Sequence, residues 1–233
     1  MTRTALRSPG SPRSARPLAR RRRRAIYDAD KEARRADILN AARKLFAKSG
    51  GQLATVSDVA QAAGLAKGTV YLYFRTKEEL YLALYEEFVT ALLTRMQAAA
   101  AHASAAASIV NAMCSFVAER PELMRLASLA NSVLEQNVSE EFVLGYKTRI
   151  TATLLATANR LVEVLPDASF DGVARLLLQT YAFSVGLWQQ ADLPAVVRAL
   201  MRKHPELSVL RIDFARELRC GLDLLWSVPR SEA

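Results

Sequence analysis

Residues 55–80 read TVSDVAQAAGLAKGTVYLYFRTKEEL, and they contain two short helical patterns separated by a glycine. Thr55 is a favourable N-cap and Asp58 stands three residues after it, so the first helix is expected to begin near Val56. Gly64 follows at the point where a helix of about two turns needs a residue that accepts positive φ. The stretch therefore predicts two helices joined by a tight turn.

The second of these helices opens with small or basic side chains, at Ala66, Lys67, Gly68 and Thr69. Such an N-terminus can approach the edge of a base pair closely. Later positions are assigned to the inside at Val70, Leu72 and Phe74 and to the outside at Tyr71 and Tyr73. Thr76 then caps a third helix and places Lys77 in its first turn, where free backbone N–H groups attract phosphate. These groups suit a groove lined by phosphates.

The stretch resembles the DNA-binding segment of TetR-type (tetracycline-repressor-like) transcriptional regulators. The shared positions run from Thr55 through Ala60, Ala63, Gly64, Leu65, Gly68, Tyr71, Tyr73, Phe74 and Lys77 to Leu80. The resemblance implies that Ala66, Lys67, Gly68, Thr69 and Tyr71 face the major groove and that Thr55, Tyr73 and Lys77 contact phosphates. It covers the DNA-binding third of the chain, and beyond that third it rests on helical layout and length.

Few of these residues can identify a base by themselves. Lys67 suits a guanine edge, and Thr69 offers a methyl group to thymine together with a hydroxyl. Specificity for each half-site is therefore expected to be modest and to require a dimer. Each residue also has an alternative role that involves no DNA. Thr55 could serve only as a cap, Gly68 could serve only to permit packing, and Tyr71 or Tyr73 could be half-buried core residues.

The net charge of +9 is distributed unevenly along the chain. Residues 1–30 have a net charge of +7, residues 31–75 have +5, and the rest of the chain has −3. A basic N-terminal third indicates a nucleic-acid-binding end joined to a nearly neutral partner or ligand domain. The apolar content of 51% is ample for a core, and the abundance of Ala, Leu and Arg favours helix over sheet.

The sequence predicts three segments. Residues 1–29 mix Arg, Ser and Pro without apolar periodicity and are predicted to form a disordered basic arm. Whether this arm contacts DNA or is a solvated tail stays open. Residues 30–75 are predicted to form the helix-turn-helix DNA-binding domain, with a first helix that ends at Gly50 and Gly51. Residues 76–233 are assigned to a helical ligand-binding and dimerisation domain.

The third segment is expected to be a bundle of helices. The helix that begins at Thr76 should reach at least Met96, and further helices are expected near 107–118, 121–136, 139–165, 170–190, 194–203 and 213–228. No alternating strand pattern competes, so the fold class is all-α. The helices near 170–190 and 213–228 are apolar nearly all round and therefore need two partners. The resemblance implies that they pair with their copies in a homodimer, and a central place in a monomer core is the alternative.

The resemblance also implies an effector pocket between the long helix and the C-terminal bundle. Polar residues in otherwise apolar stretches are the candidates for its lining, namely Asn131, Tyr146, Thr180, Tyr181, Ser184, Trp188 and Gln189. A mostly apolar bundle with few internal charges favours a small hydrophobic or aromatic effector.

No convincing catalytic set is present. Ser104 with His102 and Cys220 with His204 lack a third orienting group, and no phosphate loop or dinucleotide fingerprint occurs. The two histidines lie far apart without neighbouring ligand spacing, so neither a metal nor a cofactor is expected. Cys114 and Cys220 fit free thiols in a reducing cytoplasm, and no apolar run is long enough to span a membrane.

These observations predict a cytoplasmic, homodimeric transcriptional regulator that binds a palindromic operator in double-stranded DNA and is released as a repressor by a small molecule. Two alternatives remain open. One is a structural protein that coats DNA with little sequence choice, and the other is a regulator whose C-terminal domain binds a protein partner. An enzyme is not expected.

Overall fold

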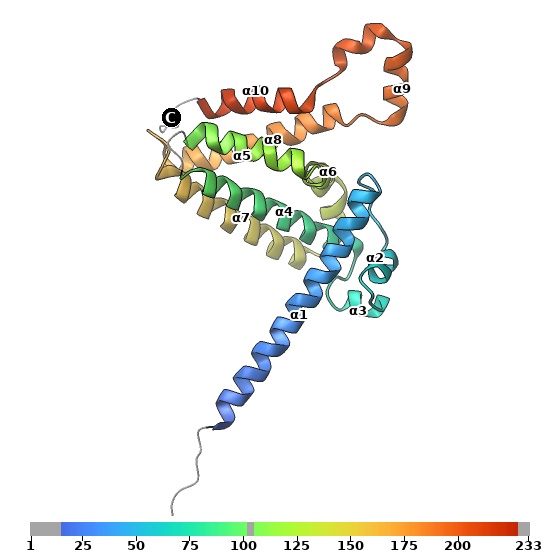
Figure 1. The fold of residues 1–233 in the computed structure, drawn as a ribbon, viewed down its shortest axis with the longest axis vertical. Helices are drawn as coiled ribbons and strands as arrows, with labels where there is room; N and C mark the ends of the chain where they lie inside the picture. Colours follow the sequence, from blue (N-terminus) through green and yellow to red (C-terminus); the bar gives the residue numbers. More distant parts are fainter. Residues whose placement is uncertain (1–14, 102–104, 228–233) are drawn as a thin grey trace, which may run out of the picture.

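The computed structural model describes residues 15–101 and 105–227, which Figure 1 shows as an assembly of helices. The α-helices are α1 (Ala15–Lys48), α2 (Val56–Ala62), α3 (Lys67–Tyr71), α4 (Lys77–Ala99), α5 (Ala105–Glu119), α6 (Glu122–Leu129), α7 (Glu140–Val162), α8 (Phe170–Ala191), α9 (Ala195–Lys203) and α10 (Phe214–Ser227). Three short helical segments complete the chain, η1 (Ala130–Leu134), η2 (Glu135–Asn137) and η3 (Pro205–Leu210). Because no strand occurs in the described residues, the all-α prediction is confirmed.

Helices α1, α2 and α3 pack together as an N-terminal unit. Their buried side chains are Ile38, Leu39, Ala42 and Phe46 from α1, Val56, Val59 and Ala60 from α2, and Val70 from α3. Gly64 has φ 68° in the turn after α2, a conformation that an L side chain rarely adopts. The predicted start of α2 near Val56 is confirmed, and α3 begins at Lys67 with Ala66 as its N-cap.

Helix α1, which precedes Gly50, is longer than the sequence predicted. Apolar periodicity placed its start at residue 30 and left residues 1–29 as a disordered arm, whereas α1 begins at Ala15. Residues 15–29 contain several Ala and Arg and no Gly, so their intrinsic helix propensity is high. A helix that projects from the rest of the molecule, as α1 does in Figure 1, needs no apolar stripe, and periodicity therefore misses it. Residues 1–14 of the predicted arm lie outside the described residues.

Helix α4 is the central element of the molecule. It packs against α1 in the N-terminal unit and against α5, α6 and α7 in the C-terminal bundle, as Figure 1 shows. Its buried side chains include Leu80, Leu82, Leu84, Phe88 and Met96. Further packing of α7 on α8, α8 on α10 and α10 on α5 closes the bundle. The same helix thus belongs to both parts of the protein.

The segment 121–136 is not the single helix that the sequence predicted. Helix α6 ends at Leu129, and the chain continues through a π-helical turn, η1, and a 3₁₀ turn, η2. The hydroxyl groups of Ser128 and Ser132 donate hydrogen bonds to the backbone carbonyls of Arg125 and Ser128 at 2.8 and 3.2 Å. Such side-chain bonds compete with the regular backbone ladder and bend helices.

Helix α9 and segment η3 form an arm between α8 and α10. They pack chiefly on each other, and Figure 1 shows α9 at the edge of the molecule, away from the N-terminal unit. Four large apolar side chains of this arm are exposed, those of Val196, Leu200, Val209 and Leu210. No helix in the described part of the chain is long and apolar enough to cross a membrane.

Candidate DNA-binding surface and ligand cavity

The start of α2 is held by a complete capping box. The Thr55 hydroxyl accepts a hydrogen bond from the Asp58 N–H at 3.2 Å and donates one to Oδ2 of Asp58 at 2.7 Å. The Thr55 N–H also donates to Oδ2 of Asp58, at 3.1 Å. These bonds stabilise the carboxylate and lower the pKa of Asp58 below its usual range. Thr55 therefore caps α2. Because Thr55 is also exposed, it is accessible to a phosphate as well.

A surface groove lies where α2, α3 and the start of α4 meet. It is lined by Thr55, Val56, Ser57, Lys67, Tyr71 and Lys77. Four of the eight residues predicted to contact DNA therefore share one concave surface. The Lys67 ammonium lies 5.9 Å from the centroid of the Tyr71 ring, a distance suited to a cation–π contact. The groove offers two ammonium groups, three hydroxyls and the N-terminus of α4 to an anionic partner.

The remaining predicted DNA-binding residues flank this groove. Ala66 and Gly68 are exposed, while Thr69 and Tyr73 are half-buried. A Cβ atom placed on Gly68 would meet no atom within 4 Å, so packing inside this chain does not require a glycine there. The open space beside Gly68 leaves room for the close approach of a partner. Tyr73 packs partly against the core, which fits the open alternative for this residue.

The prediction for Leu72 was wrong. This side chain was assigned to the inside with Val70 and Phe74, but it is 81% exposed, while those two are buried. Helix α3 ends at Tyr71, and Leu72 is its C-cap, so the expected alternation does not continue through it.

Three side chains tie the N-terminal unit to the C-terminal domain. The Tyr81 hydroxyl of α4 accepts a hydrogen bond from the Ala54 N–H at 2.8 Å. On the other side of α4, the Arg43 guanidinium of α1 donates to the Glu87 carboxylate at 2.7 Å. From α6, the Arg125 side chain lies so close to Gly51 that a Cβ there would come within 2.6 Å of it. The position of α4 and α6 is thereby coupled to the helix-turn-helix.

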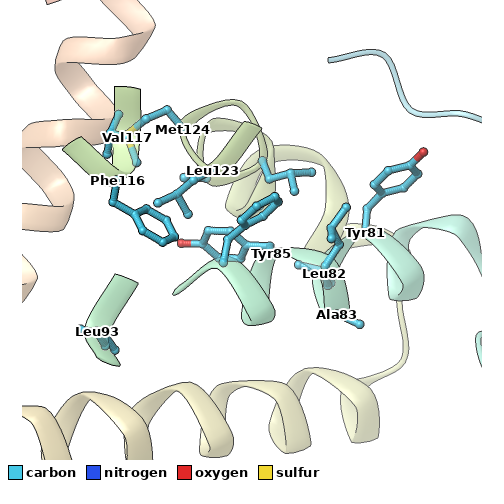
Figure 2. Close-up of a cluster of buried hydrophobic side chains, with 14 of the residues drawn as sticks. Tyr81, Leu82, Ala83, Tyr85, Leu93, Phe116, Val117, Leu123 and Met124 are labelled. Atoms are coloured by element: carbon cyan, nitrogen blue, oxygen red, sulfur yellow. The ribbon is translucent and has the colours of Figure 1, made fainter. Parts of the chain in front are cut away.

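The C-terminal bundle encloses a cavity of about 450 Å³ between α4, α5, α6, α7, α8 and α10. Its wall is mostly aliphatic, including Leu92, Met113, Leu123, Ile150 and Leu177. Figure 2 shows Tyr85 of α4 among Phe116, Val117, Leu123 and Met124 from α5 and α6. A cavity of this size and composition is typical of a site for a small apolar molecule.

Three tyrosines border the cavity. The rings of Tyr85 and Tyr146 have centroids 6.5 Å apart, and Tyr181 lies close enough to Tyr85 to affect its ionisation. Burial is the main cause that raises the pKa of Tyr85 and Tyr146 above the ordinary value. The negative charge of Glu135 raises both pKa values further. Both phenols are therefore neutral near neutral pH.

Five of the seven residues predicted to contact an effector line this cavity, namely Asn131, Tyr146, Thr180, Tyr181 and Ser184. Trp188 does not line it, because its ring packs edge-on against Phe214 with centroids 5.0 Å apart and Arg125 lies over it. Gln189 is exposed and also lies outside the lining. Sequence reasoning missed Tyr85 and Lys147, and the signal for Tyr85 was a tyrosine on the buried stripe of the long helix.

The exposed faces of α8 and α10 carry apolar side chains. Leu178 is 56% exposed and Leu224 is 69% exposed. The two helices pack tightly on each other, since a Cβ on Gly221 would come within 2.1 Å of the Phe183 ring. The Trp226 indole N–H donates to the Thr180 hydroxyl at 3.1 Å and fixes their register. Both helices therefore present apolar groups outward from a well-ordered pair.

The residues named for catalysis in the sequence do not form a described site. His102 and Ser104 lie outside the described residues. His204 contacts Glu206 with a distance of 3.0 Å between Nδ1 and Oε1, on the exposed arm, and Cys220 is exposed on α10. Burial raises the pKa of the Cys114 thiol, which makes it a poor nucleophile. The described part of the chain contains no group of three or more His, Cys, Asp or Glu residues that could hold a metal ion.

Several curated regulators are similar to this chain over part of their length. An uncharacterised HTH-type transcriptional regulator of Bacillus subtilis is 38% identical over 34% of this chain and 38% of its own length. The fatty acid metabolism regulator protein of the same organism is 38% identical over 26% of this chain and 31% of its own. An HTH-type transcriptional repressor of Mycobacterium tuberculosis is 30% identical over 55% of this chain and 65% of its own. The matched part of the chain thus spans between about a third and two thirds of the length of these relatives.

Solved structures share the fold over most of the chain. The fatty acid degradation regulator FadR of Bacillus halodurans matches 84% of this chain and 99% of its own, with a TM-score of 0.54 and 21% identity. FadR of Bacillus subtilis, solved in complex with stearoyl-CoA, matches 82% of this chain and 97% of its own, with a TM-score of 0.52 and 20% identity.

Two family models match adjoining parts of the sequence. The model described as bacterial regulatory proteins of the tetR family matches residues 38–84, which contain α2, α3 and the start of α4. The model described as a tetracyclin repressor-like C-terminal domain matches residues 82–227, more than half of the chain, and includes the cavity. The chain belongs to the TetR family of transcriptional regulators.

Proposed function

We propose that the protein is a homodimeric repressor that binds a palindromic operator through its helix-turn-helix and releases it when a small apolar effector enters the C-terminal cavity. In this proposal residues 30–75 bind DNA, and residues 76–233 hold the effector and form the dimer. The protein acts in the cytoplasm, where it has access to the DNA that it regulates.

The groove at α2, α3 and α4 is the observation that carries the DNA-binding proposal. It brings Thr55, Lys67, Tyr71 and Lys77 together on one exposed surface. Lys67 supplies a donor pair for a guanine edge, and Lys77 with the free N–H groups of α4 suits a phosphate. Gly68 has open space around it, which lets the backbone of α3 approach the floor of a major groove.

The exposed apolar faces of α8 and α10 support the homodimer. Leu178 and Leu224 are large apolar side chains that a partner of the same kind would bury. A twofold axis beside these helices would place two copies of the groove on one face of DNA, with half-sites spaced by whole helical turns. A dimer also compensates for the small number of base-reading side chains in each copy.

The helix α4 supports release by an effector. Tyr81 binds the backbone of Ala54 in the N-terminal unit, and Tyr85, one helical turn later, borders the cavity. A ligand that displaces Tyr85 or α6 therefore shifts contacts that hold the helix-turn-helix. A coupling free energy of about 1–3 kcal/mol between the two sites is sufficient for derepression.

The names of two relatives agree with an apolar effector. One curated relative is a fatty acid metabolism regulator, and one solved structure of the same fold holds stearoyl-CoA. The aliphatic wall of the cavity in this chain is compatible with a hydrocarbon chain or a ring. The wall of the cavity in this chain carries the proposal, and the names only agree with it.

Selection of random duplex DNA by the purified protein at near-physiological salt tests the DNA-binding proposal. Sequencing of the retained duplexes is expected to give a palindrome with half-sites about one helical turn apart, or a multiple of it. The matched control is Lys203→Ala, an exposed lysine on α9 far from the groove in sequence, which should retain the same motif. Retention without an enriched motif would favour a protein that coats DNA.

Sedimentation of two variants tests the dimer. Leu178→Asp is expected to produce monomers that keep their helical content, because a charge would be buried in the proposed interface. Leu144→Asp is the control, since Leu144 is also exposed, at 68%, but lies on α7. A Leu178→Asp protein that remains dimeric would remove α8 from the interface.

The basic N-terminal segment is tested by its effect on salt dependence. Each phosphate that the segment neutralises contributes a slope of about −0.9 to the dependence of log affinity on log salt. Deletion of residues 1–24 should therefore flatten the slope. An unchanged slope would assign this segment no contact with DNA.

A further inference from the structure

We propose that the enclosed part of the effector is uncharged, and that it is an apolar chain or ring bearing one neutral hydrogen-bond acceptor, such as an ester or thioester carbonyl, which meets the tyrosines Tyr85, Tyr146 and Tyr181. A carboxylate is rejected at the same place. This inference rests on the proposed function, because it names the class of ligand for the same cavity.

The charge content of the cavity wall is the first argument. Lys147 is the one charged side chain among the residues that line the cavity. Its ammonium is 2.7 Å from Oε1 of Glu135 and 5.5 Å from the centroid of the Tyr146 ring. The positive charge at the tyrosine end is thus already neutralised by a carboxylate of the protein.

The environment of Glu135 makes this ion pair difficult to open. The Glu135 side chain is 16% exposed, and its Oε1 atom is buried without a well-directed hydrogen bond. If a ligand carboxylate drew Lys147 away, Glu135 would keep an unpaired buried charge, which is strongly unfavourable. If Lys147 stayed, the ligand carboxylate would face the charge of Glu135 and lose its hydration in an apolar cavity.

Other polar groups in the wall are occupied by contacts within the protein. The Thr180 hydroxyl accepts the hydrogen bond from the Trp226 indole, and the Ser184 hydroxyl donates to the Thr180 carbonyl at 2.7 Å. The Tyr146 hydroxyl is paired with Glu135, whereas Tyr85 and Tyr181 pair with each other, and such a pair of hydroxyls keeps one O–H free to contact a ligand. Because burial keeps Tyr85 protonated near neutral pH, the pair of Tyr85 and Tyr181 can donate one hydrogen bond to a neutral acceptor.

One ligand chemistry has two possible sources. A small ester or ketone would be enclosed entirely, whereas an acyl thioester would place its carbonyl by the tyrosines and leave its charged carrier outside. The second source needs an exit at the same end, and Lys147 lines the cavity while its side chain is 48% exposed. Methyl octanoate represents the first source and octanoyl-CoA the second.

Calorimetric titration of the full-length protein tests the ligand class without DNA. The probes are two pairs that differ in charge, methyl octanoate with octanoate and methyl naphthoate with naphthoate, together with octanoyl-CoA and CoA alone. At least one ester should bind roughly tenfold or more tightly than its acid, since an unpaired charge must be desolvated in the latter case. Equal affinity for ester and acid in both pairs, or no binding by any ester or thioester, would overturn the proposal.

The Glu135→Gln variant gives a sharper result, because it leaves Lys147 free to pair with a ligand. The acid of the better pair is expected to gain roughly tenfold or more in affinity, while the ester changes little. The matched control is Glu141→Gln, an exposed carboxylate on α7 outside the cavity wall, which should leave both affinities unchanged. An unchanged preference in folded Glu135→Gln protein would contradict the role of the ion pair.

A second variant covers the case in which Glu135→Gln does not fold. Glu135→Gln combined with Lys147→Met removes both charges, so neither is left unpaired. This protein should preserve the affinity for the ester and bind the acid no better than the unaltered protein does. Loss of ester binding would contradict the proposal. If an ester binds but does not release operator DNA, the ligand class stands and the proposed derepression fails. Binding of octanoyl-CoA but of neither ester would identify the thioester as the source.

Discussion

The groove at α2, α3 and α4 and the C-terminal cavity are built from residues at different separations along the sequence. Thr55 with Asp58 and Lys67 with Tyr71 are pairs only a few positions apart, and they shape the groove locally. The cavity wall instead combines residues as distant as Tyr85 and Leu222, from six helices that must all pack correctly. The groove is therefore sensitive to single exposed residues, whereas the cavity tolerates changes that preserve its volume.

The largest expected effect is a loss of stability in the N-terminal unit. Phe46→Ala should lower the free energy of unfolding by about 3–5 kcal/mol, because Phe46 is fully buried and its ring lies 5.6 Å from that of Tyr81. Urea unfolding followed by circular dichroism measures this loss. The control is Leu72→Ala, an exposed position in the same unit, which should change stability by less than about 0.5 kcal/mol. A similar loss for both variants would contradict the assignment of the core.

The same kind of truncation in the cavity wall should cost less. Leu222 is fully buried but borders space that already exists, so Leu222→Ala removes fewer contacts than a change in a filled core. We expect a loss of about 2 kcal/mol, at the low end for leucine truncation. Unfolding under the conditions used for Phe46→Ala gives the comparison. A loss above that of Phe46→Ala would show that the cavity wall is as tightly packed as the N-terminal core.

A third variant separates DNA binding from stability. Lys67→Ala should weaken binding to the selected operator by about 1–3 kcal/mol and change binding to random DNA little. Its unfolding curve should match that of the unaltered protein, since Lys67 is exposed. Fluorescence anisotropy with both duplexes measures the difference. Equal losses on the two duplexes would assign Lys67 to phosphate instead of a base.

A smaller effect is expected where the two regions join. Tyr81→Phe removes the acceptor for the Ala54 N–H, at a cost of about 1 kcal/mol in stability. It should also reduce the change in operator affinity that an effector produces, because this bond joins α4 to the helix-turn-helix. Tyr73→Phe serves as the control for the loss of a hydroxyl in the same unit. Full effector response in Tyr81→Phe would remove this bond from the coupling.

The smallest effect concerns acid stability. The folded-state pKa of Asp58 is lowered, so its capping box contributes fully above the ordinary pKa of the carboxyl and is lost as the pH falls through the lowered value. Asp58→Asn should therefore flatten the acid limb of the stability profile slightly and leave the profile near neutral pH parallel to that of the parent. Thermal melts at a series of acidic pH values check this. An unchanged acid limb would show that other carboxylates dominate.

The local signals explain why the N-terminal unit was predictable. Thr55, Gly64 and Thr76 each determine the conformation of a few neighbouring residues, so the boundaries of α2 and α4 could be placed from sequence. The error at Leu72 arose because α3 is only one turn long and its C-cap interrupts the periodicity. The length of α1 was missed because a projecting helix lacks the apolar stripe that the prediction used.

The cavity was predictable only as a set of candidates. Tyr146, Thr180 and Ser184 stand out as polar residues in apolar helices, but whether each faces a cavity depends on the packing of distant helices. Trp188 has the same sequence signature and packs on Phe214 instead. Tyr85 could not be separated from its apolar neighbours on α4, because sequence periodicity identifies the buried face of a helix but not the space beside it.

The spacing of Tyr81 and Tyr85 has a consequence for how this regulator can evolve. Four residues of an α-helix span about 6 Å, so one end of the cavity lies a single turn from the residue that holds Ala54. Under the proposed function, mutations at that end alter ligand choice and operator affinity together, and selection must accept both changes at once. Mutations at Leu154 or Leu177, which line the cavity from α7 and α8, are free of this constraint. We therefore expect new effector specificities to arise first through the α7 and α8 side of the cavity.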